Sequence, residues 1–136
     1  MNIKRLVIAV IVVFLVFQIL DFLIHWIILA PAYGDLADVW RQDMMSKMWM
    51  MYISSLILSL LFVYIFIKGY EGRGIGEGIR YGIIIGLLLN FVGALNQYVV
   101  YPIPFSLALQ WFIYGMIEFI VCGVVVALIY KPKTDA

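Results

Sequence analysis

Four long runs of apolar residues dominate the chain, and short stretches richer in polar residues separate them. The runs cover residues 6–30, 49–67, 79–100 and 105–130. A helix of roughly 20 residues, rising about 1.5 Å per residue, crosses the hydrocarbon core of a bilayer, which is about 30 Å thick. The pattern therefore predicts an all-α integral membrane protein with four transmembrane helices, and we expect residues 1–136 to form a single membrane domain.

The segment between the first two runs, residues 33–46, mixes charged and apolar positions. Asp35 is a good N-cap residue and predicts the start of a short helix after the first span. Leu36, Val39 and Trp40 would then turn toward lipid, as in a helix that lies on the membrane surface. We therefore expect a short interfacial helix on the outer side of the membrane.

The other two connections predict different geometries. Residues 68–78 alternate glycine with charged residues, which is typical of a flexible, solvated loop. The sequence YPIPF, residues 101–105, places two prolines between the third and fourth runs, where they end one helix and start the next. The last two spans should form a tight antiparallel pair within an antiparallel four-helix bundle.

Composition supports a membrane protein and gives no sign of a nucleic-acid partner. Hydrophobic residues make up 66% of the chain and charged residues 12%, and the mean hydropathy is +1.10, which lies far from the soluble range. Nine basic and eight acidic residues nearly balance, so nothing favours a nucleic-acid partner. The lipid bilayer is the expected partner. The single cysteine, Cys122, excludes an intramolecular disulfide.

The positions of the basic residues predict the orientation. Two of them, Arg41 and Lys47, lie between the first and second runs. The others fall on the opposite side: Lys4, Arg5, Lys68, Arg73, Arg80, Lys131 and Lys133. By the positive-inside rule both termini are cytoplasmic, and we expect a plasma or inner membrane. A cleaved signal peptide is the alternative for residues 6–30, although that run is longer than a typical signal core.

Polar residues recur at helical spacing within each predicted span, so that each span has one polar face. The residues concerned are Gln18, Asp21 and His25 in the first span, Tyr52, Ser55 and Ser59 in the second, Asn90 and Gln97 in the third, with Asn96 at the same depth, and Gln110, Tyr114 and Glu118 in the fourth. An unsatisfied polar group in hydrocarbon costs several kcal/mol. These faces should therefore turn inward and line a polar pocket in the outer half of the bundle.

Two acids and the only histidine are the candidates for chemistry. At about 1.5 Å per residue, Asp21 lies about 24 Å from Arg5 and Glu118 about 20 Å from Lys131, which places both acids at similar depth. A charged group near the bilayer centre costs at least about 2.5 kcal/mol, so such acids are typically functional. We expect Asp21 and Glu118 to couple protons to the binding or transport of a small or lipid-like ligand or a cation, while His25 gates or tunes Asp21.

Two further interpretations stay open at this point. Serine, asparagine and glutamine on spanning helices often only hold helices together, which would suit an accessory or assembly subunit of a membrane complex. A transporter of four spans would need a second copy, so a homodimer is also expected. No nucleophile and base pair can be assigned with confidence, so the sequence leans away from an enzyme.

A metal or cofactor is the least favoured interpretation. Five methionines, Met44, Met45, Met48, Met50 and Met51, cluster at the start of the second span. Thioethers beside an imidazole suit Cu(I), and a haem with histidine and methionine as axial ligands uses the same chemistry. His25, Met44 and Met48 are the weak candidates for such ligands. Methionine is also an ordinary gap filler at helix contacts, and no resident cofactor is expected.

Overall fold

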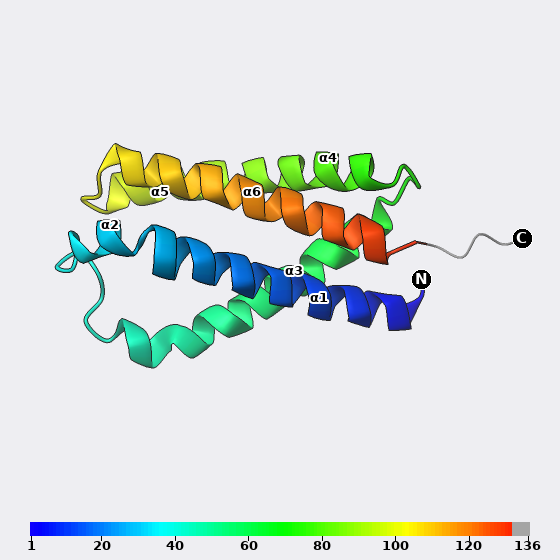
Figure 1. Cartoon of the computed structure of the whole chain (residues 1–136), viewed down its shortest axis with the longest axis horizontal. Coiled ribbons are helices and arrows are strands. Elements are labelled where there is room, and N and C mark those ends of the chain that lie inside the picture. The colour runs from blue at the N-terminus through cyan, green and yellow to red at the C-terminus, as the bar shows by residue number, and fades with distance from the viewer. Residues whose placement is uncertain (132–136) are drawn as a thin grey trace, which may run out of the picture.

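The structure is a computed structural model that describes residues 1–131 of the chain, and the predicted basic residue Lys133 lies outside these residues. The described part is helical and contains no strand. Its α-helices are α1 (Ile3–Asp21), α2 (Ala30–Gly34), α3 (Met48–Lys68), α4 (Ile75–Gly86), α5 (Val92–Val100) and α6 (Phe105–Ile129) (Figure 1). Two π-helical stretches, Phe22–Ile28 and Leu87–Phe91, and a 3₁₀ turn, Met44–Lys47, join them.

Four continuous helices are long and apolar enough to cross a membrane, which confirms the predicted number of spans. They cover Ile3–Ile28, Met44–Lys68, Ile75–Val100 and Phe105–Ile129. The first span thus consists of α1 and the π-helical stretch that follows it, and the third consists of α4, a π-helical stretch and α5. The chain therefore has the build of an integral membrane protein.

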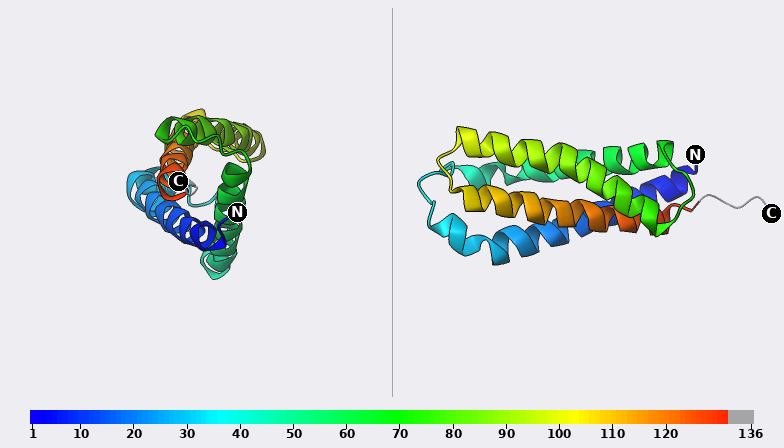
Figure 2. Two further views of the ribbon diagram at one scale, coloured as in Figure 1. Left: turned by 90° about the vertical axis from the view of Figure 1, so that its right-hand side faces the viewer. Right: turned by 90° about the horizontal axis from the view of Figure 1, so that it is seen from above.

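The spans lie side by side along one long axis, and successive spans run in opposite directions (Figure 1). α6 packs against α4 and α5 on one side and against α1 on the other, while α3 packs on α1. α3 crosses α1 obliquely, so the first turns of α3 lie far from α4 and α5 (Figures 1 and 2). The assembly is consequently closed around α4 and α6 and more open beside the first half of α3.

The two ends of the molecule differ in charge. α1 begins and α6 ends at one end, which we call the basic end because it carries Lys4, Arg5, Lys68, Arg73, Arg80 and Lys131. The opposite end, which we call the cap end, carries two basic residues among the described ones, Arg41 and Lys47. Both contact Asp43, at 2.7 Å and 3.3 Å.

Glycines bring α4 and α6 into direct backbone contact at the basic end. A Cβ atom on Gly78 would lie 2.2 Å from the carbonyl oxygen of Gly123, and one on Gly82 would lie 2.4 Å from that of Phe119. Real side chains do not fit at such distances, so only glycine permits this packing. The last two spans therefore pack closely along α4, in the half of the third span nearer the basic end.

Aromatic side chains fill the space between α1, α3, α4 and α6. Phe17 meets Phe119 with ring centroids 5.2 Å apart, and Phe62 meets Tyr81 at 4.7 Å. The Tyr81 hydroxyl donates a hydrogen bond of 2.6 Å to the carbonyl oxygen of Phe62. Phe17, Phe62 and Phe119 are almost fully buried. This core fills the basic half of the molecule with apolar contacts and one internal hydrogen bond.

The loop between α3 and α4 is more ordered than the glycines suggest. The Glu77 carboxylate accepts hydrogen bonds from the backbone N–H groups of Glu71 (2.6 Å) and Arg73 (2.8 Å). Gly72 and Gly74 have φ angles of +76° and +68° and permit the turn that brings these groups together. α4 begins at Ile75, earlier than the apolar run predicts, and Glu77 in its first turn holds the preceding loop through these two bonds.

The segment after the first span also differs from the prediction. Its short helix α2 begins at Ala30 with Pro31 in the first turn, and Asp35 follows the helix instead of starting it. Leu36, Val39 and Trp40 do not turn away toward lipid: they pack against a second buried cluster, formed by Ile24, Leu29, Ile103, Leu107 and Ala108. Residues 30–43, which we call the cap segment, therefore fold back over the end of α1 and α6, because burying these side chains is favourable.

Candidate functional site

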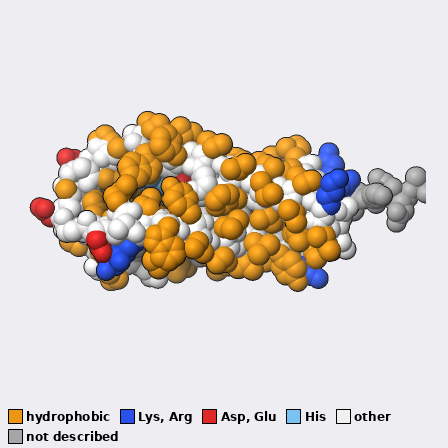
Figure 3. Space-filling view, turned by 90° about the horizontal axis from the view of Figure 1, so that it is seen from below, with side chains coloured by type: hydrophobic (Ala, Val, Ile, Leu, Met, Phe, Trp, Pro, Cys, Tyr) orange, Lys and Arg blue, Asp and Glu red, His pale blue; other side chains and the backbone are white. Residues whose placement is uncertain are grey.

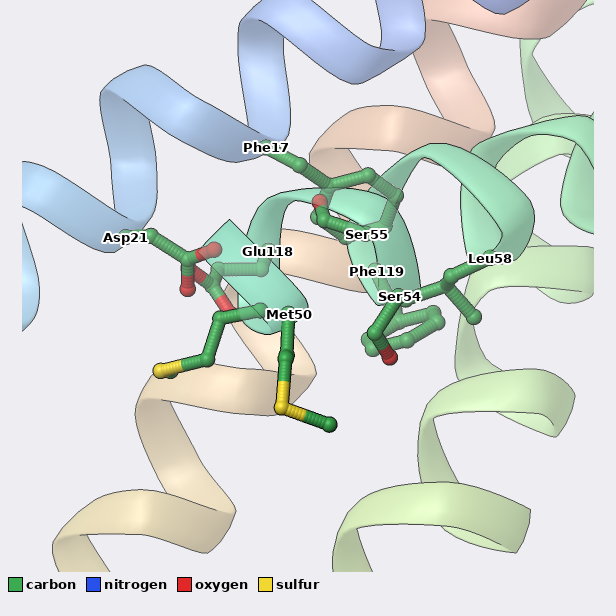
Figure 4. A pocket seen from close by; sticks show the side chains of 9 residues that line it. Phe17, Asp21, Met50, Ser54, Ser55, Leu58, Glu118 and Phe119 are labelled. Atoms are coloured by element: carbon green, nitrogen blue, oxygen red, sulfur yellow. The ribbon is translucent and has the colours of Figure 1, made fainter. Parts of the chain in front are cut away.

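A pocket of about 450 Å³ lies between α1, α3 and α6 in the half of the spans nearer the cap end. Nine side chains from these three helices line it (Figure 4): Phe17, Asp21, Met50, Met51, Ser54, Ser55, Leu58, Glu118 and Phe119. The volume lies within the range of about 300–1,000 Å³ that is typical of small-molecule sites. The oblique course of α3 makes this space, because the start of α3 leaves the other helices there.

Two carboxyl groups face each other in this pocket. Asp21 is the last residue of α1, and Glu118 lies near the middle of α6. Figure 4 shows their side chains pointing toward one another. Glu118 is only 7% exposed, and its Oε1 atom has no hydrogen-bond partner among the described residues. A buried, unpartnered carboxyl oxygen is costly, which makes Glu118 the main candidate for a functional residue in this pocket.

The rest of the pocket lining is apolar, aromatic or hydroxylic. The rings of Phe17 and Phe119 and the thioethers of Met50 and Met51 form most of the wall. Ser55 accepts a hydrogen bond of 2.7 Å from the side-chain amide of Gln18, which fixes one edge. None of the nine lining residues is basic. The site therefore combines apolar contact area with acceptor oxygens and offers no positive charge.

His25 lies one turn beyond Asp21, in the π-helical stretch that continues the first span. Its Nε2 atom is 3.8 Å from Oδ1 of Asp21. Both side chains are about two-fifths exposed, His25 at 39% and Asp21 at 44%. Short π-helical segments occur often at functional sites because they change the direction of side chains locally. Here the segment brings the imidazole between the pocket and the cap segment.

A hydrogen-bonded cluster of aromatic side chains ties the cap segment to the first and last spans. The Tyr33 hydroxyl lies 2.5 Å from Nδ1 of His25 and accepts a hydrogen bond of 2.7 Å from Nε1 of Trp111. Trp40 donates a bond of 3.0 Å to the carbonyl oxygen of Tyr33. Burial raises the pKa of the Tyr33 phenol above its ordinary value, so this group is a neutral hydroxyl at physiological pH.

Of the residues predicted to bind a ligand or couple protons, the structure brings Asp21, Glu118 and Ser55 together in the pocket. His25, also predicted, contacts Asp21. Two more predicted residues border this region: Gln18 donates to Ser55, and the buried Ser59 donates a bond of 2.8 Å to the Ser55 carbonyl oxygen.

Six predicted lining residues lie elsewhere. Asn90 packs over Gly115 of α6, and its side-chain nitrogen is buried without a hydrogen-bond partner among the described residues. Tyr114 packs against the buried cluster beneath the cap segment. Four side chains are exposed on the helices instead of lining the pocket: Tyr52, Asn96, Gln97 and Gln110.

Sequence analysis missed several residues of the site. Phe17 and Phe119 are neighbours of the two acids on their helices, one turn before Asp21 and directly after Glu118. That proximity is the only sequence feature that points to them. Tyr33 and Trp111 are separated by 78 positions. Helical periodicity cannot connect residues so far apart, and only the folding back of the cap segment brings them together.

The structure gives no support to a metal site built from His, Cys, Asp and Glu. Within residues 1–131 no group of three or more such side chains is placed to hold a metal ion. Met44 and Met48, proposed above as weak ligands with His25, do not line the pocket, whereas Met50 and Met51 do. The thioethers at the site are thus part of its apolar wall.

None of the protein-family models, curated proteins or solved structures compared with this chain matches it. The class of protein is therefore defined by its own fold: over residues 1–131 the chain is all-helical, and four of its helices are long and apolar enough to cross a membrane. The function has to be argued from the geometry of the pocket.

Proposed function

We propose that this chain binds a small, mostly apolar cation inside the membrane and exchanges it for a proton held by Asp21 and Glu118. One observation carries the proposal: two carboxyl groups face each other in an apolar pocket, and Oε1 of Glu118 is buried there without a partner. A ligand that carries positive charge would compensate the charge of these acids in apolar surroundings. An anion would meet only acidic groups and hydroxyls.

The pocket wall favours a cation with a large apolar surface over a bare metal ion. The faces of Phe17 and Phe119 attract positive charge through their π systems. Thioether side chains such as Met50 and Met51 adapt to ligands of irregular shape. A hydrated metal ion would gain little from these contacts and would need more oxygen ligands than the two acids and two serines supply.

Two neighbouring carboxyl groups in a medium of low dielectric constant do not both ionise readily, so at least one holds a proton when the pocket is empty. A cation that enters replaces the charge of that proton, and the proton leaves. Ligand affinity should therefore increase as the pH rises, since fewer protons compete. The same competition would couple cation movement to a proton gradient if the pocket opens alternately to the two sides.

The distribution of charge supports an orientation with both termini in the cytoplasm. The basic end carries most basic side chains, whereas the two at the cap end are paired with Asp43. By the positive-inside rule the basic end is cytoplasmic, and we place the protein in a plasma or inner membrane. The pocket then lies in the outer half of the bilayer. Figure 3 shows acidic atoms set into an otherwise apolar face nearer the cap end.

The direct test is binding of tetraphenylphosphonium, an apolar cation, to the purified protein in detergent by titration calorimetry. We expect Glu118→Gln to weaken binding by about tenfold or more, equivalent to about 1.4 kcal/mol, and to abolish the increase of affinity with pH. Asp38→Asn is the control, since this acid is exposed in the cap segment. Unchanged affinity in Glu118→Gln across the pH range would rule out the proposal.

A second candidate is an accessory subunit of a membrane complex. The observation in its favour is the exposure of Asn96 and Gln97 on α5, where amide groups could bond to a neighbouring protein. For this function the variants Asn96→Leu and Gln97→Leu should reduce recovery of the complex from mild detergent. Cation binding should be absent in the wild type.

A further inference from the structure

Tyr33 is the point at which three separate elements meet. It belongs to α2 in the cap segment, and its hydroxyl reaches both His25 on the first span and Trp111 on α6. The Tyr33 ring also stacks on the His25 ring with centroids 5.9 Å apart and planes inclined by 10°. The position of the imidazole is thus controlled from the cap segment and from α6, as well as by its own helix.

Counting the protons in this cluster favours one tautomer of the neutral histidine. The indole N–H of Trp111 can only donate, so the Tyr33 oxygen is its acceptor. The single hydroxyl proton of Tyr33 is then free to point at Nδ1 of His25, 2.5 Å away. With Nδ1 as its acceptor, each of these protons has a partner, whereas with a proton on Nδ1 the Tyr33 hydroxyl proton would have no acceptor among the described residues. The imidazole proton is therefore on Nε2, the atom that faces Asp21 at 3.8 Å.

We propose that Tyr33 is a positioning residue of the pocket: held by Trp111, it occupies Nδ1 of His25 and so directs the Nε2–H group of that ring toward Asp21. This inference concerns the same pocket as the proposed function and rests on it for its role in ligand binding. The pair of hydrogen bonds itself stands on the geometry alone.

The arrangement gives Asp21 a fixed polar neighbour on the side away from Glu118. Asp21 is the more exposed of the two acids, and without a neighbouring donor its carboxyl group would have more freedom to rotate. The group facing it from its own helix is His25, and Glu118 faces it from α6. An Nε2–H directed at Asp21 favours the orientation in which its charge acts on the pocket. Tyr33 thus acts on the ligand through two other side chains.

Nitrogen NMR of the single histidine tests the tautomer directly. Because the chain has one His, histidine labelled with ¹⁵N gives signals from one ring, and no assignment is needed. At a pH where the ring is neutral, we expect a protonated Nε2 and an unprotonated Nδ1 shifted by a strong hydrogen bond. In Tyr33→Phe we expect that hydrogen-bond shift to disappear and both tautomers to be populated.

Two further variants keep the test decisive. Trp111→Phe removes the donor that orients the Tyr33 hydroxyl and should produce a smaller change in the same direction. Tyr114→Phe, one turn further along α6, removes a hydroxyl that makes no hydrogen bond to a described side chain, and it should leave the spectrum unchanged. A wild-type ring protonated at Nδ1, or a Tyr33→Phe spectrum identical to that of the wild type, would overturn the inference. If Tyr33→Phe does not fold, the wild-type and Trp111→Phe spectra decide the matter.

Binding of tetraphenylphosphonium measures the consequence for the pocket. We expect Tyr33→Phe to weaken binding about threefold to tenfold, and we expect no further weakening when it is combined with Asp21→Asn, because both changes remove one pathway. Additive losses would show that Tyr33 does not act through Asp21 and would overturn its positioning role. Absence of binding by the wild type would contradict the proposed function, while the NMR spectra would still decide how the ring is held.

Discussion

Two buried glutamates show how differently the two ends of the molecule are built. Glu77, at the basic end, is 4% exposed, and its carboxylate accepts two backbone hydrogen bonds that close the loop before α4. Glu118, nearer the cap end, is 7% exposed, and one of its oxygens has no partner among the described residues. The fold thus satisfies the hydrogen-bonding groups of one buried glutamate and leaves an oxygen of the other without a partner.

The surroundings of the two acids differ in the same way. Around the basic end, glycines let α4 and α6 touch, and aromatic rings fill the space between helices. Toward the cap end, α3 leaves its neighbours, and the space it opens is lined by apolar side chains, hydroxyl groups and two acids, one of which has an unpartnered oxygen. A fold can leave polar groups unsatisfied only where the rest of the structure is stable enough to bear the cost. The basic end therefore supports the structure and the other half supplies the site.

The largest effect on stability is expected from adding a side chain where α4 and α6 touch. In Gly82→Ala the new Cβ would lie 2.4 Å from the carbonyl oxygen of Phe119. Backbone atoms cannot move aside as a flexible side chain can, so the helices must separate. We expect a loss of about 3 kcal/mol in the free energy of unfolding. Denaturant titration in mixed micelles, followed by circular dichroism, measures this loss.

Gly76→Ala is the matched control on the same helix. A Cβ on Gly76 would meet nothing within 4 Å, and alanine favours the helix over glycine by about 0.5–1 kcal/mol. This variant should be as stable as the wild type or slightly more stable. Equal destabilisation by the two alanines would show that α4 and α6 do not touch in the membrane protein.

The next largest effect is expected at the satisfied glutamate. Glu77→Gln replaces one acceptor oxygen with an NH₂ group, which would face a backbone N–H of the loop. Hydrogen bonds to a charged acceptor are worth more than neutral ones, and we expect a loss of about 2 kcal/mol. The same titration measures it, with the exposed Asp43→Asn as a control that should change stability much less. Wild-type stability in Glu77→Gln would mean that the loop does not depend on these bonds.

Substitution of the unsatisfied glutamate, Glu118, should increase the free energy of unfolding instead of lowering it. Glu118→Leu removes the unpartnered Oε1 atom and leaves apolar surface against Phe17 and Phe119. We expect a gain of about 1 kcal/mol in stability together with loss of tetraphenylphosphonium binding, the usual trade of stability against function. Glu118→Gln keeps a polar group in the pocket and should gain less. A marked destabilisation by leucine would mean that Glu118 serves the fold and not a ligand.

Periodicity and length were sufficient to predict the four spans, because a membrane imposes both on any helix that crosses it. The common depth of Asp21 and Glu118 could also be predicted, since the rise per residue fixes depth once the ends are known. The faces of the helices were harder to predict. A π-helical stretch at Leu87–Phe91 adds residues to a turn and rotates all that follows. Gln97 therefore leaves the face that regular spacing assigns to it.

Contacts made by folding back were beyond any local pattern. Asp35 was expected to start a helix, but Pro31 starts it earlier. Leu36, Val39 and Trp40 then find a buried cluster that exists only because the ends of α1 and α6 lie together. Such contacts depend on the relative placement of whole helices, which a single sequence does not encode in its periodicity.

The smallest expected effect concerns an exposed ion pair at the basic end. Glu71 forms ion pairs with Arg80 (2.8 Å) and Arg73 (3.1 Å), and the contact with Arg80 is the main cause that holds the pKa of Glu71 below its ordinary value of 4.5. Because the pKa of Glu71 is lower in the folded state than in the unfolded chain, the charged carboxylate stabilises the fold at pH values above its unfolded-state pKa. That contribution disappears as the pH falls through the folded-state pKa. The difference in Tm between wild type and Glu71→Gln should therefore be small but positive at neutral pH, and it should vanish in acid. Because Glu71 is exposed at the surface, salt should screen the difference at neutral pH, whereas the effect of Glu77→Gln should persist in salt. Such a contrast would confirm that the basic end is stabilised by buried hydrogen bonds more than by its surface charges.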